Sequence, residues 1–121
     1  MSNGSVIEGV VINSVLSPGV RVGKGSVIKD SIILNDVIIG ENVTIQKSII
    51  DKKVVVGRDS YIGYGEDNTA NIEKPDLLSS GITVVEKRTE IPAQTEIGRN
   101  CRVFRSHTFT SKRIKSGQTL R

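Results

Sequence analysis

The sequence contains few of the residues on which most globular domains build a core. Its 121 residues include no tryptophan, two tyrosines, two phenylalanines, three prolines and one cysteine. A single cysteine excludes an internal disulfide and favours a reducing, cytoplasmic setting. No apolar run approaches the roughly 20 residues of a membrane-spanning helix. Met1–Ser5 forms no signal segment, and we interpret it as a disordered start or a cloning remnant.

Acidic residues are absent from the last part of the chain. Seven basic and no acidic residues lie between Arg99 and Arg121, within a formal net charge of +4. Such a local positive field favours anions, although a solvated edge of the domain has the same composition. Because the segment carries no recognisable nucleic-acid motif, nucleic-acid binding is the least favoured function.

What the sequence does contain is a repeat of 17 residues. Ser17–Ile33, Leu34–Ile50 and Asp51–Asp67 each carry a Val-x-[Val/Ile]-Gly element at the same place. A fixed short period indicates a stack of similar units, each of which buries its apolar side against its neighbours.

Within each unit the inward positions recur every five or six residues. Two positions that are two residues apart on a strand share one face. The pattern therefore predicts very short strands with one small and one aliphatic inward side chain, three strands to a triangular coil of 17–18 residues. Glycines follow the aliphatic position, where we expect corners with unusual backbone angles. The small positions are Val20, Ser26, Ser31, Val37, Val43, Ser48, Val54 and Ser60, and the aliphatic ones are Val22, Ile28, Ile33, Ile39, Ile45, Ile50, Val56 and Ile62.

The same spacing defines the domain boundaries. A six-residue period resumes at Val85 and continues to Val103, with Thr83, Thr89, Thr95 and Cys101 in the small column. We predict a β-helix domain over residues 6–103, a loop extruded at a corner over residues 66–80, and a basic tail or capping segment over residues 104–121. Ile114–Leu120 could form one last step.

These hexads resemble the left-handed parallel β-helix of the hexapeptide-repeat proteins, and one branch in particular. The segments VIEGVVINSVLSPGVRVGKGSVIKDSIILNDVII from Val6 and SGITVVEKRTEIPAQTEI from Ser80 are similar to the C-terminal domain of the glucose-1-phosphate adenylyltransferase family. The resemblance implies that the β-helix winds in a left-handed sense. It also implies an assembly and allosteric-regulatory domain without catalysis of its own, which works in glycogen or starch synthesis beside an N-terminal nucleotidyltransferase domain that this chain lacks.

The resemblance further implies that Lys52 and Lys87 match positions involved in activator binding. A lysine ammonium suits phosphate or carboxylate, so an anionic metabolite is the expected effector; both lysines could equally be ordinary solvent-facing corner residues. Lys53 and Arg58 could extend the same patch. We expect no cofactor.

The remaining reactive side chains favour no catalytic or metal site. His107 is the only histidine, which excludes the three-histidine zinc site of β-helical carbonic anhydrases. It leaves open the alternative of a free-standing hexapeptide-repeat acyltransferase with His107 as general base, although a surface histidine is favoured. Cys101 lies in an inward column, so we expect a buried small side chain rather than a nucleophile.

Apolar residues also recur at positions that point outward. Such stripes indicate a contact surface, although β-branched residues are common on exposed strands as well. We predict that these residues pack against another subunit of a homo-oligomer or against the missing catalytic domain. The candidates are Val15, Ile32 and Ile49 on one face and Ile38 and Val55 on another.

Overall fold

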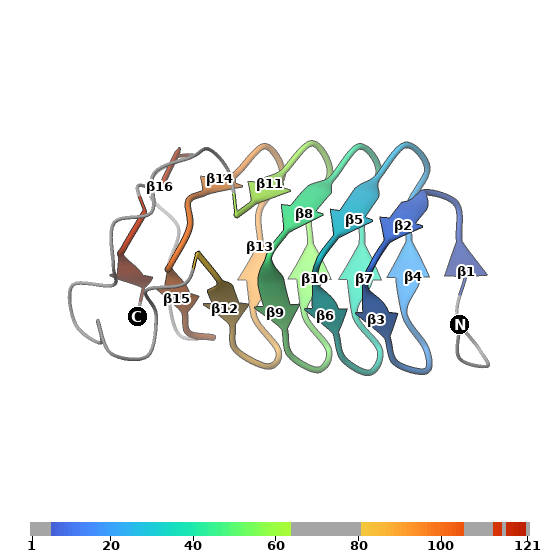
Figure 1. Ribbon diagram of the computed structural model, residues 1–121, viewed down its shortest axis with the longest axis horizontal. Helices are drawn as coiled ribbons and strands as arrows, with labels where there is room; N and C mark the ends of the chain where they lie inside the picture. The colour runs from blue at the N-terminus through green and yellow to red at the C-terminus, as the bar shows by residue number, and fades with distance from the viewer. Residues whose placement is uncertain (1–5, 64–80, 106–112, 115, 121) are drawn as a thin grey trace.

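The chain winds into a triangular solenoid of three parallel sheets (Figure 1). The computed structural model describes residues 6–63, 81–105, 113–114 and 116–120. The first sheet consists of β1 (Val6–Ile7), β4 (Arg21–Val22), β7 (Ile38–Ile39), β10 (Val55–Val56) and β13 (Glu90–Ile91). The second consists of β2 (Val10–Ile12), β5 (Val27–Lys29), β8 (Thr44–Gln46), β11 (Tyr61–Ile62), β14 (Glu96–Ile97) and β16 (Arg113–Ile114). The third consists of β3 (Val15–Leu16), β6 (Ile32–Ile33), β9 (Ser48–Ile50), β12 (Thr83–Val85), β15 (Arg102–Val103) and β17 (Thr119–Leu120).

The winding is left-handed. In Figure 1 the strands of the first sheet run upward on the far side, and the chain then crosses the top and descends the near side through the other two sheets. It moves from right to left as it does so. The predicted left-handed parallel β-helix is therefore confirmed, against the right-handed preference of ordinary crossover connections.

The core is the pair of inward columns that the sequence predicted. Every aliphatic position from Val22 to Ile62 has at most 2% of its surface exposed, and the small positions from Val20 to Ser60 at most 3%. Cys101, Thr83, Thr89 and Thr95, which occupy the later small inward positions, are equally buried. Branched aliphatic side chains fill the narrow interior, so this fold needs almost no aromatic residues.

Hydroxyl groups in one inward column link successive coils. The Ser31 hydroxyl donates a hydrogen bond to the carbonyl of Lys29 (2.8 Å) and accepts one from the N–H of Ser48 (3.2 Å). One coil earlier, the Ser14 hydroxyl donates to the carbonyl of Ile12 and accepts a hydrogen bond from the N–H of Ser31. Each hydroxyl satisfies a polar backbone group at a corner where the sheet ladder is interrupted.

The glycines have a different role from the one predicted. Of Gly23, Gly40, Gly57 and Gly63, only Gly63 has a positive φ (80°). A Cβ on Gly23 would lie 2.5 Å from the carbonyl oxygen of Gly40, and one on Gly57 would lie 2.7 Å from Cα of Ala93. The prediction of unusual angles is thus wrong for three of the four, which are glycines because the next coil passes too close for a side chain.

The left-handed backbone conformation occurs instead at the second residue of many corners. Asp36, Lys53 and Arg88 occupy equivalent places with φ values of 59°, 56° and 61°. Such angles are uncommon for residues other than glycine, asparagine and aspartate. At these three corners a positive φ is therefore combined with an exposed polar side chain.

The sheets keep their register across residues 64–80. Ile38 pairs with Val55, 17 positions further on, whereas Val55 pairs with Glu90, 35 positions further on. The predicted loop over residues 66–80 lies outside the described residues. Beyond residue 103, β16 and β17 add strands to the second and third sheets, as expected for one last step.

Candidate anion-binding corner

Within the described part of the chain, the interior of the solenoid offers no place for a substrate. The inward side chains form one continuous buried cluster along the axis. No group of three or more histidine, cysteine, aspartate or glutamate residues that could hold a metal ion occurs among the residues described. In the same residues, no helix has the length and apolar character needed to cross a bilayer. Any site in the described part of the molecule must therefore be on its surface.

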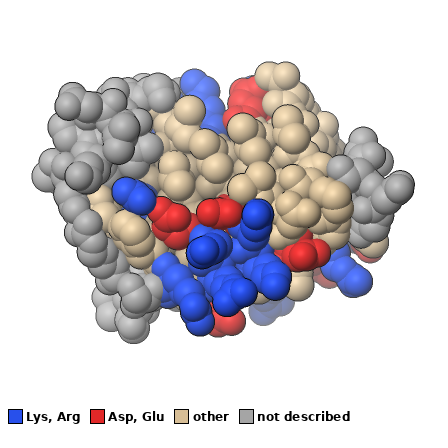
Figure 2. Space-filling model, turned by 90° about the horizontal axis from the view of Figure 1, so that it is seen from below, with Lys and Arg blue, Asp and Glu red and all other residues tan. Residues whose placement is uncertain are grey.

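The strongest surface feature is a cluster of cations along one edge. Figure 2 views the molecule from below, onto the edge where the connections from the third to the first sheet turn, and shows lysine and arginine side chains gathered at its centre. Two successive connections supply Lys52 and Lys53, between β9 and β10, and Lys87 and Arg88, between β12 and β13. We call these four residues the basic corner.

Backbone hydrogen bonds fix how the two connections stack. The N–H of Arg88 donates to the carbonyl of Lys52 at 2.8 Å, and the N–H of Lys53 donates to the carbonyl of Asn35 at 2.9 Å one coil earlier. The register of the flanking strands, Ile50 with Val85 and Val55 with Glu90, stacks Lys87 on Lys52 and Arg88 on Lys53. All four side chains are exposed. Since coils are spaced by about 4.8 Å, cations at this spacing can contact one phosphate or carboxylate group together.

A hollow adjoins the basic corner at its C-terminal side. It has a volume of about 680 Å³ and is lined by Glu86, Lys87, Arg88, Arg102, Phe104 and Arg105. A sugar phosphate fits within a space of this size. Among the described residues, four cations and one carboxylate give the lining an excess of positive charge, which favours anionic ligands.

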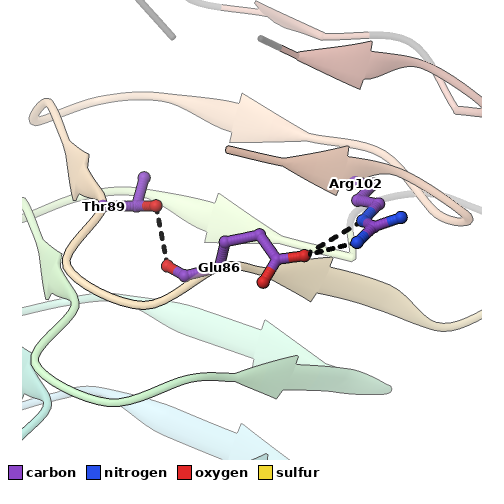
Figure 3. Close-up of polar contacts among 3 residues, drawn as sticks. All are labelled: Glu86, Thr89 and Arg102. Carbon is purple, nitrogen blue, oxygen red and sulfur yellow. Dashed lines mark hydrogen bonds and ion pairs between the residues drawn. The ribbon is translucent and has the colours of Figure 1, made fainter. Parts of the chain in front are cut away.

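One ion pair crosses the hollow between neighbouring coils (Figure 3). The Oε1 atom of Glu86 accepts hydrogen bonds from Nε (3.0 Å) and Nη2 (2.8 Å) of Arg102. The backbone carbonyl of Glu86 accepts the hydroxyl of Thr89 at 2.7 Å. The Arg102 guanidinium also stacks over the ring of Phe104, 4.6 Å from its centroid. Both charged side chains are about one-third exposed or less.

The sequence singled out part of this site. The structure brings Lys52 and Lys87 together, as their proposed common role requires, and places Lys53 beside them, as expected from the sequence. Arg88, the fourth residue of the basic corner, was not predicted. Arg58 does not belong to this corner, because it lies in the turn between β10 and β11, where its carbonyl accepts the N–H of Gln94. The Glu86–Arg102 pair and Phe104 were missed. The ion pair could have been suspected from the sequence, because Glu86 and Arg102 carry opposite charges and are 16 residues apart, close to the length of one coil.

The other reactive residues lie elsewhere. Cys101 is fully buried, and its Sγ donates to the carbonyl of Arg99 at 3.5 Å, which confirms the predicted structural position. His107 lies outside the described residues.

The predicted interface residues form two stripes on either side of the basic corner. Val15, Ile32 and Ile49 stack in register on the third sheet. Ile38 and Val55 stack on the first sheet. Their outward orientation is confirmed, with exposed fractions from 38% at Val55 to 60% at Val15 and a half-buried Ile49. Their role as an interface stays a prediction.

Parallel three-sided coils with short inward pairs define the class of the chain as a left-handed β-helix built from hexapeptide repeats. Residues 1–85 match the family model described as "GlmU-like, C-terminal hexapeptide". The chain belongs to this family.

Within this family, the chain is similar in sequence to glucose-1-phosphate adenylyltransferases. The chain is 42% identical over 123 residues to glucose-1-phosphate adenylyltransferase of Acetivibrio thermocellus, with 99% of this chain and 29% of that protein covered. It is 48% identical over 120 residues to the enzyme of the same name from Thermotoga maritima, with 97% of this chain and 28% of that protein covered. The chain is homologous to the C-terminal part of these enzymes and spans less than a third of their length.

Among solved structures, the acetyltransferase domain of PglB from Neisseria gonorrhoeae FA1090 in complex with acetyl coenzyme A is similar over 95% of this chain and 49% of that chain. Its sequence identity is 17% and its TM-score 0.44. A likeness of that size carries no argument about activity.

Proposed function

We propose that this chain is the assembly and allosteric-regulatory domain of a glucose-1-phosphate adenylyltransferase, and that it binds an anionic metabolite at the basic corner. The observation that carries the proposal is the stacking of Lys87 on Lys52, with Lys53 and Arg88 beside them, in a domain homologous to the C-terminal part of these enzymes. The domain needs no cofactor and performs no chemical step.

Charge and position both support the anion site. The corner presents four exposed cations on two adjacent coils, and the backbone bonds that stack them belong to the rigid ladder of the solenoid. The backbone positions of the four cations are therefore fixed, so a ligand with phosphate groups needs to order only their side chains. Catalysis would require an enclosed set of acid, base or nucleophilic groups, whereas this surface offers mainly cations.

The two apolar stripes support the assembly role. They flank the basic corner, so a subunit or domain that covered either stripe would approach the bound anion. An effector at the corner could then alter the contact between this domain and its neighbour, which is the coupling that allosteric regulation requires.

Calorimetric titration tests the effector role. We expect fructose 1,6-bisphosphate, 3-phosphoglycerate or inorganic phosphate to bind the chain, and Lys52→Gln and Lys87→Gln each to weaken that binding by roughly fivefold, since each removes one charge-assisted contact. Lys24→Gln is the matched control, because Lys24 is an exposed lysine in the turn between β4 and β5.

The result that contradicts the proposal is equally defined. If none of the three anions binds, or if Lys24→Gln weakens binding as much as Lys87→Gln, the basic corner is not an effector site. Formation of ADP-glucose from ATP and glucose 1-phosphate by this chain alone would contradict its non-catalytic role.

A further inference from the structure

The hollow beside the basic corner contains a carboxylate where an anion site should have none. Its lining includes Lys87, Arg88, Arg102 and Arg105, yet Glu86 extends among these cations. Like charges repel, so Glu86 lowers the affinity of the hollow for any anion that enters. The proposed anion site, on which the present inference rests, does not by itself explain why a carboxylate lies among these cations.

Glu86 is held in place by two independent contacts. Its carboxylate accepts two hydrogen bonds from Arg102, and its backbone carbonyl accepts one from the hydroxyl of Thr89, the residue before β13 (Figure 3). Arg102 belongs to β15, one coil further along than Glu86, and the register pairs Val85 with Val103 beside it. The pair therefore spans two coils at the mouth of the hollow.

The same contacts hold Arg102 away from a ligand. Its Nε and Nη2 atoms point to Glu86, and its guanidinium lies over the face of Phe104. An arginine binds phosphate best through two adjacent N–H groups. The edge formed by Nε and Nη2 is one such donor pair, and the Glu86 carboxylate occupies it.

We infer that Glu86 is a built-in competitor for Arg102, which sets how strongly the hollow binds phosphorylated anions. A phosphate group that enters must either accept the repulsion of Glu86 or displace its carboxylate from Arg102. Displacement breaks a contact between Glu86, the residue after β12, and Arg102 of β15, so binding also loosens one link between two coils. Glu86 in this sense sets the affinity of the hollow, and its repulsion is greatest for the most highly charged ligands.

Removal of the carboxylate charge tests the inference. Glu86→Gln keeps the shape of the side chain but releases the charge-assisted hold on Arg102. We expect the dissociation constant for fructose 1,6-bisphosphate, measured by calorimetry on the full chain at low salt, to fall about three- to tenfold. The gain should be larger for fructose 1,6-bisphosphate than for inorganic phosphate, and it should shrink at 1 M salt because screening removes it.

Glu96→Gln provides the matched control. Glu96 accepts Nε of Arg113 at 2.7 Å across neighbouring coils of the second sheet, so it makes the same kind of ion pair outside the hollow. It should leave the dissociation constant unchanged within a factor of two. Far-ultraviolet circular dichroism and the thermal midpoint of each variant verify that the fold is kept.

The possible outcomes separate this inference from the proposed function. If the unaltered chain binds the bisphosphate, Lys87→Gln weakens it and Glu86→Gln does not tighten it, the inference is overturned and the effector role stands. Equal gains for both anions, or an equal gain in Glu96→Gln, also overturn it. If neither the unaltered chain nor Glu86→Gln binds either anion, both proposals fail. Binding that appears only in Glu86→Gln supports the competitor.

Discussion

Ser31 and Ser48 occupy the same position on neighbouring coils, and the N–H of Ser48 donates to the hydroxyl of Ser31 at 3.2 Å. Both residues are buried. Ser31→Ala would leave this N–H without its partner, whereas the carbonyl of Lys29 would keep the N–H of Lys47 at 3.1 Å. We expect a loss of about 1–3 kcal/mol in the free energy of unfolding, measured by urea denaturation. A loss below about 0.5 kcal/mol would show that the hydroxyl column contributes little to the cohesion of the stack.

The close approach of coils at Gly57 makes a second prediction. Gly57→Ala should lower the free energy of unfolding by at least about 2 kcal/mol, because the new Cβ would collide with the backbone of Ala93. Chemical denaturation measures the change.

Gly25→Asn is the matched control for Gly57→Ala. Gly25 has a φ of 78°, but Asn42 holds the equivalent corner on the next coil with a φ of 55°, and the nearest atom to a new Cβ is the end of that flexible side chain. We expect Gly25→Asn to cost about 1 kcal/mol or less. If it costs as much as Gly57→Ala, a collision with backbone is no more costly than one with a movable side chain, which would contradict the close-approach explanation for Gly57.

The apolar stripe on the third sheet makes a third prediction. Ile32→Lys combined with Ile49→Lys should leave the circular dichroism spectrum unchanged, because both side chains point outward. It should shift the sedimentation profile of the chain toward monomer, since the charges oppose burial of the stripe. Val10→Lys with Val27→Lys places two charges on the second sheet and serves as the control. Equal profiles for all three proteins would contradict the interface.

The thiol of Cys101 makes a fourth prediction. Because Cys101 is fully buried, it should not react with a thiol reagent in the folded chain and should react fully in denaturant. Cys101→Ser should cost about 1 kcal/mol or less, because Ser31 and Ser48 occupy the equivalent inward position on earlier coils. Rapid labelling of the native protein would contradict the burial of this column.

The coil could be predicted from the sequence because the apolar positions of the repeat are the buried positions of successive coils. Ile28 and Ile45 are separated by one period, and one period is one turn of the solenoid, so equivalent residues stack in register. The hand came only from the resemblance, since inward spacing is the same for either hand. The close approach at Gly23 could not be predicted, because contact between backbones of different coils leaves no periodic signature beyond the glycine itself.

The candidate site was only partly predictable for a related reason. Lys52 and Lys87 were identified by family resemblance, and their stacking follows from register once the insertion between them is placed. The Glu86–Arg102 pair depends on side-chain rotamers that span two coils, which spacing alone does not determine. Arg58 was grouped with Lys53 by closeness in sequence, yet a triangular coil sends residues five apart to different edges.

The undisturbed pairing of Tyr61 with Glu96, 35 positions apart, has a practical consequence. The strands on either side of residues 64–80 align as if those residues were not counted, so chain length at that corner is decoupled from height along the axis. A foreign peptide could be grafted there, or the native segment exchanged, while the rungs above and below stay aligned. The stacked coils thus keep a fixed spacing along the axis, whereas the corner accommodates segments of different length.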